Sequence, residues 1–477
     1  MTADGDGADA DQGLAHVGGD HAGRCAAVAL GGVQILAHHV DLLDDVAAVA
    51  EAAKQFGAEE YELTISSREE TGVEALKKEV STVSYSRSGA MTVRCVVGGK
   101  SGYATSELVT PEAAAEIVET ACDNARVLDD ADQVGLFPGS DHYETSRDTA
   151  VALPDTDALK ERALKLQELA YGASEKIVDG TQSFVSGMNI SRDVMNSAGL
   201  QLHYEAGLVY QGLMAAVKDG EEASDDFCLT DISKKTVEET VDKAVSGALS
   251  KLGADTVPSG KYDIIMDSPT ICSLLERYAS VFSARSAYLK TTLLAGKEGE
   301  VIASDALTLI DDPFHPEKFG HCPFDGEGVA VYTKKVIENG RLNTLLYNRM
   351  YAKLLGKETT GNAADATHIE PKGLYIAPGT LSNEALMEKL GDGLYLTGLQ
   401  GLHAGANVQS GDFSLQAEGF LVKDGKKAAP VKNFTVADNF YELLKKVAEV
   451  SSEVKFGVGS DFGAPEVLLT GIAVSGK

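Results

Sequence analysis

The stretch GLHAGANVQSGDFSLQAEGF, residues 401–420, gathers side chains that could carry out nucleophilic or acid–base chemistry. His403, Ser410 and Asp412 are the three residue types of a hydrolase triad. A triad requires its members to converge in space, which short spacing along the chain does not ensure. The segment also lacks the strand, Gly-x-Ser-x-Gly and helix of a nucleophile elbow. We interpret it as a glycine-rich turn that leads into a strand over Phe413–Phe420, and a hydrolase that uses His403 with Asp412 stays an alternative.

A second group of chemistry-bearing residues lies in HPEKFGHC, where His315, His321 and Cys322 are close in sequence. Imidazole and thiolate groups are ligands that zinc prefers, so a metal at these three residues is a further alternative. Pro316 and Pro323 indicate an irregular loop, and no fourth ligand is evident. Our main interpretation is that these are ordinary loop residues.

The zinc site of a helical metallopeptidase is not present in the sequence. Such a site needs two histidines on one helix face, with a glutamate beside one of them to activate water. No histidine in this chain is followed by glutamate, and none occurs between His203 and His315. A helix expected over residues 269–284 therefore offers Glu276 and Arg277 on its polar side, and no imidazole.

Composition narrows the class of protein. A chain of 477 residues is too long for one ordinary core, so two or three domains are expected. Lys plus Arg is 42 and Asp plus Glu is 72, a formal net charge of −30. This charge repels phosphate backbones, and no basic stripe offsets it, so we expect no direct nucleic-acid binding. The six cysteines form no Cys-x-x-Cys pair and predict buried, reduced thiols in a cytoplasmic protein.

The start of the chain differs from the rest. Residues 1–41 are rich in Asp, Gly and Ala, and we expect a disordered extension there. The apolar run at 25–37 is too short to span a bilayer and lacks a Lys/Arg-rich lead, so neither a membrane segment nor a secretory signal is expected.

Periodicity and turn residues divide the remainder into two domains. Residues 42–257 are expected to form an α/β domain, and the linker DTVPSGKY places the boundary near Pro258. Residues 258–477 are expected to be rich in β-strands, with hairpin turns at Asn339-Gly340 and Asp424-Gly425. We expect a charged, solvated loop at 218–226, and helices over 42–56, 111–125, 157–177, 237–252, 269–284, near 348–355 and near 438–450.

Several separated segments resemble the TldD/PmbA family, and specifically its PmbA (TldE) branch. The closest segment is GLHAGANVQSGDFSLQAEGFLVKDGK. PFDGEGVAVYTKKVIENGRLNTLLYN, KETTGNAAD and GVEALKKEVSTVSYSRSGAMTVRCVVGGKSGYATS are also similar to family segments. The resemblance covers residues 42–477, in the family's order, and leaves the N-terminal extension unexplained.

The resemblance implies an α+β fold with the two-domain TldD/PmbA-like architecture. It also implies an assembly in which a TldD-type and a PmbA-type chain form a heterodimeric zinc metallopeptidase. The family is linked to maturation of a peptide antibiotic precursor and degradation of an antitoxin, and carries the older label "modulator of DNA gyrase"; the charge of −30 argues that any gyrase link is indirect.

The TldD-type chain carries His-Glu-x-x-x-His on the helix that matches 269–284, and a cysteine ligand near its C-terminus. Here no cysteine follows Cys322, and the matching tail reads KFGVGSDFGAPEV. The resemblance therefore implies a partner subunit with no cofactor of its own, zinc being held by the TldD-like chain. A peptide-binding homodimer without catalysis is a third possibility.

The expected substrate or partner cleft lies in the signature segment. A glycine-lined strand beside a cleft could hold an extended peptide by main-chain hydrogen bonds. On this hypothesis, valine at Gly405 and Gly411 should abolish peptide processing while the chain stays folded. The residues expected to line the cleft are His403, Gly405, Asn407, Ser410, Gly411, Asp412 and Phe413.

Overall fold

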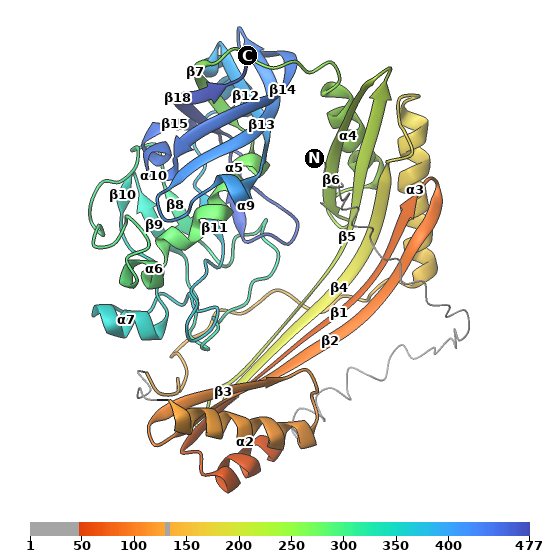
Figure 1. Cartoon of the computed structure of the whole chain (residues 1–477). Coiled ribbons are helices and arrows are strands. Elements are labelled where there is room, and N and C mark those ends of the chain that lie inside the picture. The colour runs from red at the N-terminus through yellow and green to blue at the C-terminus, as the bar shows by residue number, and fades with distance from the viewer. Residues whose placement is uncertain (1–46, 129–133) are drawn as a thin grey trace, which may run out of the picture. The chain divides into compact units, whose positions relative to one another are not determined.

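Long antiparallel strands dominate the first half of the chain. The computed structural model describes residues 47–128 and 134–477 (Figure 1), so the predicted extension at 1–41 lies outside the described residues. Residues 47–56 are helical, as expected. The elements that follow are β1 (Glu60–Leu76), β2 (Glu79–Val97), β3 (Lys100–Ser106), α2 (Pro111–Val127), α3 (Thr156–Ala173), β4 (Gln182–Asn196), β5 (Gln201–Asp219), β6 (Glu222–Asp231) and α4 (Val237–Ser250).

These strands form one antiparallel sheet in the order β3-β2-β1-β4-β5-β6. A two-residue turn at Lys77 and Lys78, both at positive φ, joins β1 to β2. Helix α2 packs on β2 and β3 at one end of the strands, and α3 and α4 cover β1, β4, β5 and β6 at the other (Figure 1). The apolar stripes of α3 and α4 bury a core with Val73, Val185 and Leu213 of the sheet.

The second half of the chain is built from two further sheets. One has the order β14-β13-β12-β7-β18-β15 and the other β10-β9-β8-β11-β17-β16. The strands are β7 (Gly260–Met266), β8 (Leu309–Asp311), β9 (Lys334–Glu338), β10 (Arg341–Leu342), β11 (Leu374–Ile376), β12 (Gly393–Gln400), β13 (Asp412–Lys423), β14 (Lys426–Asn439), β15 (Val447–Val450), β16 (Lys455–Phe456), β17 (Phe462–Ala464) and β18 (Val467–Ser475).

Helix α5 (Ser268–Tyr278) contacts both of these sheets. Asp267 caps its N-terminus and Pro269 occupies its first turn. Its buried stripe of Ile271, Leu274 and Tyr278 belongs to the core that the two sheets share. The other helices of this half are η1 (Ala279–Phe282), α6 (Ala284–Tyr288), α7 (Arg349–Leu355), α8 (Asn383–Leu390), α9 (Leu402–Gly405), α10 (Phe440–Leu443) and η2 (Leu444–Lys446).

The α+β fold class is confirmed, and so are both hairpin turns, where Asn339-Gly340 and Asp424-Gly425 have positive φ at both positions. Three local predictions were wrong. The helix over 269–284 ends at Tyr278 and continues as η1 and α6. The helix near 438–450 shrinks to α10 and η2, after which β15 pairs with β18. The loop at 218–226 is a tight turn, because residues from Glu222 onward pair with β5. The domain boundary near Pro258 stays a prediction.

A segment around Glu327 connects the second half of the chain to the long sheet and to the extended linker before α3. The Gly326 carbonyl accepts from Nη2 of Arg192 at 3.3 Å, and the Gly328 carbonyl accepts from the Tyr143 hydroxyl at 2.7 Å. The Glu327 carboxylate accepts the backbone N–H of Arg349 at 2.9 Å. Burial, helped by neighbouring Asp325, raises the pKa of Glu327 from 4.5 to about 8.

This carboxyl should make stability depend on pH. The folded chain keeps the Glu327 proton over a range in which the unfolded chain has lost it, so the free energy of unfolding should fall as pH rises from about 4.5 to about 8. Glu327→Gln should flatten that part of the profile, measured by urea unfolding at each pH, whereas Glu453→Gln at an exposed site should not. An unchanged slope in Glu327→Gln would contradict the assignment.

Candidate functional site

The signature segment forms a short helix, a closed turn and the start of a strand. Asn407 organises the turn, since its side-chain oxygen accepts the backbone N–H groups of Gln409 and Ser410 at 3.0 and 3.1 Å. The Asn407 N–H donates to the Asp412 carbonyl at 2.8 Å, and the Gly411 N–H donates to the Asn407 carbonyl at 2.9 Å. Backbone groups that would otherwise need water are thus satisfied inside residues 407–412, which we call the glycine loop.

Side chains at the C-terminal end of helix α5 anchor the glycine loop. The Tyr278 hydroxyl donates to the Gly411 and Asp412 carbonyls at 3.2 and 3.1 Å. Burial raises the pKa of Tyr278 to about 12, so the hydroxyl keeps its proton. Its ring is fully buried and stacks on Phe440 with centroids 4.4 Å apart. The neighbouring Arg277 donates from Nη2 to the Ala406 carbonyl at 2.9 Å.

The glycines at 405 and 411 are required by packing. A Cβ at Gly405 would lie 2.5 Å from the Ser414 carbonyl oxygen. Gly411 has φ of +85°, and a Cβ there would lie 2.6 Å from the Tyr441 ring. Valine at these positions would therefore disturb the loop itself. The expectation that such variants stay folded and lose only peptide processing is not supported by this geometry.

The structure does not assemble His403, Ser410 and Asp412 into a triad. His403 is exposed on α9, and among the described residues no hydrogen bond joins it to Ser410 or Asp412. The Asp412 carboxylate accepts from Nδ2 of Asn439 at 2.9 Å, a bond that lowers the pKa of Asp412. Ser410 Oγ accepts the Asp412 backbone N–H at 3.2 Å. A base without an orienting partner is a poor base for hydrolysis.

The strand after the glycine loop has no free main-chain edge for a peptide over most of its length. Between Gln416 and Val422, β13 pairs with β12 on one side and with β14 on the other. Phe413 is buried, and an antiparallel bridge with Ala406 covers its main chain. Over Gln416–Val422 the neighbouring strands already use the backbone groups of β13, so a peptide cannot pair with the strand there; a cleft at the residues before it stays a prediction. The side chains of His403, Asn407 and Asp412 remain exposed above it.

The opposite flank of α5 packs against β16 and β17, which belong to the tail where the resemblance places a cysteine ligand in TldD-type chains. Here α5 carries Cys272 and Glu276 in its middle and Arg277 in its last turn. Burial raises the pKa of Cys272 to about 12, so the free side chain stays a thiol. Within the described residues, no group of three or more His, Cys, Asp or Glu side chains is placed to hold a metal ion. The donor set does not fit zinc.

His315, His321 and Cys322 have other contacts. His321 Nδ1 lies 2.9 Å from Asp148 Oδ1, and its Nε2 lies 3.0 Å from the His315 carbonyl oxygen. Both ring nitrogens thus face acceptors, and the bond to Asp148 raises the pKa of His321. The Cys322 thiol donates to the Phe324 carbonyl at 3.2 Å. The His315 ring packs against Tyr375 and Phe456, with ring centroids 4.8 and 4.7 Å apart. The three side chains therefore make separate structural contacts and do not converge as a ligand set.

The residues that hold the glycine loop escaped the sequence analysis. The sequence placed Arg277 only on the polar side of its helix and gave Tyr278 no role. Asn439 is 27 positions from Asp412. A tyrosine at the end of an apolar stripe is a weak signal, because the hydroxyl's partner depends on tertiary structure. No feature of the sequence alone indicated that Asn439 meets the loop.

Family models match the two halves of the chain. The model described as the PmbA/TldA metallopeptidase C-terminal domain matches residues 259–476, and PmbA/TldA metallopeptidase domain 1 matches residues 61–125. A metalloprotease of Methanothermobacter thermautotrophicus is 32% identical over 64% of this chain and 69% of its own length. The chain belongs to the PmbA/TldD family.

Further members of the PmbA/TldD family are similar over most of the chain. A metalloprotease PmbA homolog of Haemophilus influenzae is 24% identical over 92% of this chain and 97% of its own. A modulator of a DNA gyrase from Thermotoga maritima has a solved structure with a TM-score of 0.83 and 28% identity, covering 91% of this chain and 100% of that one. TldE from Thermococcus kodakarensis gives a TM-score of 0.81 and 26% identity, with coverage of 90% and 100%.

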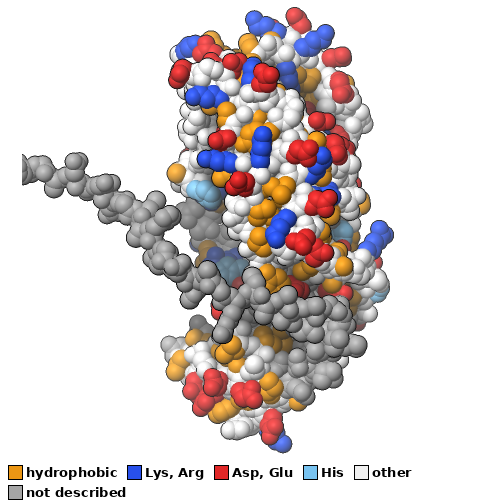
Figure 2. Space-filling model, turned by 90° about the vertical axis from the view of Figure 1, so that its right-hand side faces the viewer, with side chains coloured by type: hydrophobic (Ala, Val, Ile, Leu, Met, Phe, Trp, Pro, Cys, Tyr) orange, Lys and Arg blue, Asp and Glu red, His pale blue; other side chains and the backbone are white. Residues whose placement is uncertain are grey.

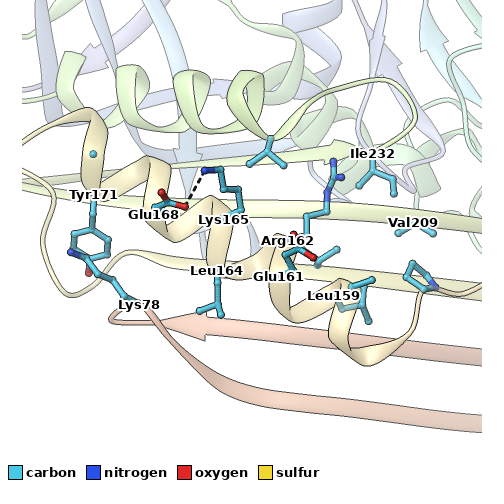
Figure 3. A pocket seen from close by; sticks show the side chains of 15 residues that line it. Lys78, Leu159, Glu161, Arg162, Leu164, Lys165, Glu168, Tyr171, Val209 and Ile232 are labelled. Carbon is cyan, nitrogen blue, oxygen red and sulfur yellow. Dashed lines mark hydrogen bonds and ion pairs between the residues drawn. The ribbon is translucent and has the colours of Figure 1, made fainter.

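A groove of about 1170 Å³ lies beside α3, away from the glycine loop (Figure 3). Its charged side chains have mixed sign, and Lys165 pairs with Glu168 at 3.0 Å. Lys78 lies over the Tyr171 ring at 4.6 Å from its centroid. These are contacts of an amphipathic surface helix, and they bring together no group of catalytic type. Size alone therefore does not make this groove the functional site of a PmbA/TldD-family chain.

One face of the molecule can be compared with the absence of a basic stripe in the sequence. On the face that Figure 2 shows, positive and negative side chains are interspersed, and neither sign gathers into a patch. In the described part of this PmbA/TldD-family chain, no helix has the length and apolar character needed to cross a membrane.

The anchoring of the glycine loop can be tested at Tyr278. Tyr278→Phe keeps the ring but removes the hydroxyl, so the Gly411 carbonyl keeps only the N–H of Phe440 and the Asp412 carbonyl keeps only the N–H of Asn407. The free energy of unfolding should fall by about 1–2 kcal/mol, and limited proteolysis should cut residues 407–412 faster. Tyr288→Phe, at an exposed tyrosine, serves as the control. Equal proteolysis of the two variants would show that the hydroxyl does not hold the loop.

Proposed function

We propose that this chain is the PmbA/TldE-like subunit of a two-chain zinc metallopeptidase, in which a TldD-like chain holds the zinc. The complex would act on peptides or small unfolded proteins. Membership of the PmbA/TldD family and similarity to proteins named metalloprotease and TldE support this proposal. The observation that carries it is the composition of α5 and the facing tail, which offer no imidazole and no reactive thiolate.

The chain's own contribution is a shaped surface. Tyr278 and Asn439 fix the glycine loop, and Arg277 fixes Ala406 just before it. Helix α9 and the loop together present the side chains of His403, Asn407 and Asp412 to solvent. A rigid loop loses little conformational entropy on binding, so it can position a peptide or a partner at low cost. The acceptor oxygen of Asp412 and the imidazole of His403 can bond to the amide groups that every peptide carries.

The loss of peptide cleavage in a His403 variant distinguishes a positioning role of this surface from direct catalysis. If the glycine loop positions a peptide or partner, His403→Ala should lower peptide cleavage by the reconstituted complex by less than about tenfold, because binding is shared among several contacts. If His403 were the catalytic base, the loss should be about 10²–10⁴-fold. The measurement is the cleavage rate of a fluorogenic peptide by the chain mixed with a His-Glu-x-x-x-His sister chain. A loss in the larger range would support the hydrolase alternative.

A second test of the proposed function measures the metal content of the purified chain. The purified chain should contain no stoichiometric zinc and should not cleave the peptide alone, whereas the complex should lose activity to a chelator and regain it with zinc. Asp365→Asn removes an exposed carboxylate that pairs with His368, and it serves as the surface control for His403→Ala. Chelator-sensitive cleavage by the isolated chain would overturn the division of labour. Recovery of a homodimer without any sister chain would favour the peptide-binding alternative.

A further inference from the structure

A second polar cluster lies at the opposite end of α5 from the glycine loop. Strand β7 ends at Met266, which pairs with Leu396 of β12 and with Val467 of β18. The next position on each strand is polar: Asp267, Thr397 and Glu466. Because side chains alternate along a strand, these three lie on the same face of the sheet as Ile265, Tyr395 and Leu468, which form one buried cluster. An aspartate and a glutamate therefore become neighbours at the edge of an apolar cluster.

Several oxygen atoms in this cluster have no partner among the described residues. Glu466 is only 7% exposed; its Oε1 accepts from the Tyr395 hydroxyl at 2.7 Å, but its Oε2 is buried and unpaired. Oγ1 of Thr397 is also buried and unpaired. Thr270 is 3% exposed, and its hydroxyl bonds to the Asp267 carboxylate, which leaves its oxygen lone pairs unused. Thr270 lies in the first turn of α5, where its backbone N–H donates to Asp267 at 2.9 Å and its side chain is close to the same carboxylate.

Buried oxygens without partners are costly, so a set of them around two carboxylates indicates a missing positively charged ligand. We propose that Asp267, Thr270, Thr397 and Glu466 bind a small monovalent cation, sodium or potassium, at the N-terminus of α5. Carboxylate and hydroxyl oxygens are hard ligands that suit such ions and do not suit zinc. Two of the four proposed ligands are carboxylates and two are hydroxyls. The cluster therefore differs from a transition-metal site, which would gather three or more His, Cys, Asp or Glu side chains, a grouping not found in the described residues.

The net charge of the cluster favours a monovalent cation over a divalent one. Lys427 lies over the Tyr395 ring, 3.9 Å from its centroid, and 4.8 Å from that of Phe420. Its ammonium group lies against the two rings and contributes one positive charge beside Asp267 and Glu466. Lys243 also acts on Asp267 and Lys455 on Glu466, both from exposed positions where solvent screens their charge. With Lys427 as the ammonium group that packs on the rings of the cluster, the two carboxylates keep one negative charge, which one monovalent ion neutralises. A water molecule could satisfy the oxygens but would leave this charge uncompensated in a buried place.

The binding of this ion does not depend on the proposed function. It would fix the start of α5 to β12 and β18, whereas Tyr278 fixes the end of α5 to the glycine loop. Burial raises the pKa of both Asp267 and Glu466 when no ion is considered. A bound cation would reverse that shift, because a nearby positive charge favours the ionised form.

The test compares thermal unfolding of the full chain in chloride salts of matched ionic strength. In sodium or potassium chloride the wild-type Tm should exceed the Tm in choline chloride by ~2 °C or more, because an ion that binds only the folded state stabilises it. Glu466→Gln keeps the shape and the acceptor for Tyr395, and its Tm should be the same in all these salts. Asp267→Asn should behave likewise, whereas Glu453→Gln, at an exposed glutamate, should keep the wild-type response.

Each other result would overturn the proposal. Equal Tm values of the wild type in choline, sodium and potassium chloride would mean that water or a shared proton occupies the cluster. Stabilisation by calcium or magnesium chloride alone would contradict the charge argument. A sodium response that survives in both Glu466→Gln and Asp267→Asn would place the ion elsewhere. If either variant is poorly folded, its circular dichroism in choline chloride will show this, and the remaining variant decides.

Discussion

The hydroxyl of Tyr278 is the contact on which the candidate site depends. It reaches two successive carbonyls, those of Gly411 and Asp412, from the last turn of α5. A buried ring cannot shift without losing its stack on Phe440, so the hydroxyl is held at one place. The glycine loop must then adopt the one path that brings both carbonyls to this donor. The shape of the exposed surface follows from an interaction inside the core.

This constraint explains the composition of the signature segment better than catalysis does. Gly411 needs a positive φ where the chain passes the Tyr441 ring, and Gly405 needs a bare backbone beside Ser414. Asn407 and Ser410 use their polar atoms to close the turn. Of the polar residues expected to act on a substrate, His403 is therefore the one whose side chain the loop does not use to maintain its own structure. Asp412 shares its carboxylate with Asn439.

Local signals allowed much of the fold to be predicted. Asn339-Gly340 and Asp424-Gly425 specify their turns through residues that tolerate positive φ, and Pro111 marks a helix start for the same kind of local reason. Long-range contacts could not be predicted. The break after Tyr278 depends on Ala284 and Leu346 meeting across the core, and the short helix before β15 depends on pairing with β18. The pairing of buried charges could not be predicted either. Oδ2 of Asp311 accepts from Nζ of Lys334 at 3.0 Å and from Nδ2 of Asn362 at 2.7 Å, and these residues are distant in sequence.

Each end of α5 is held by contacts that do not involve the middle of the helix. Its start is fixed at the polar cluster around Asp267, and its end is fixed at Tyr278 and Arg277. The middle, with Cys272, Ser273 and Glu276, contributes to neither anchor. Residue types in the middle can therefore change without moving the helix or the glycine loop. On the proposed function, a TldD-like chain carries its zinc ligands at those positions, and the surface beside the helix keeps its shape in both chains.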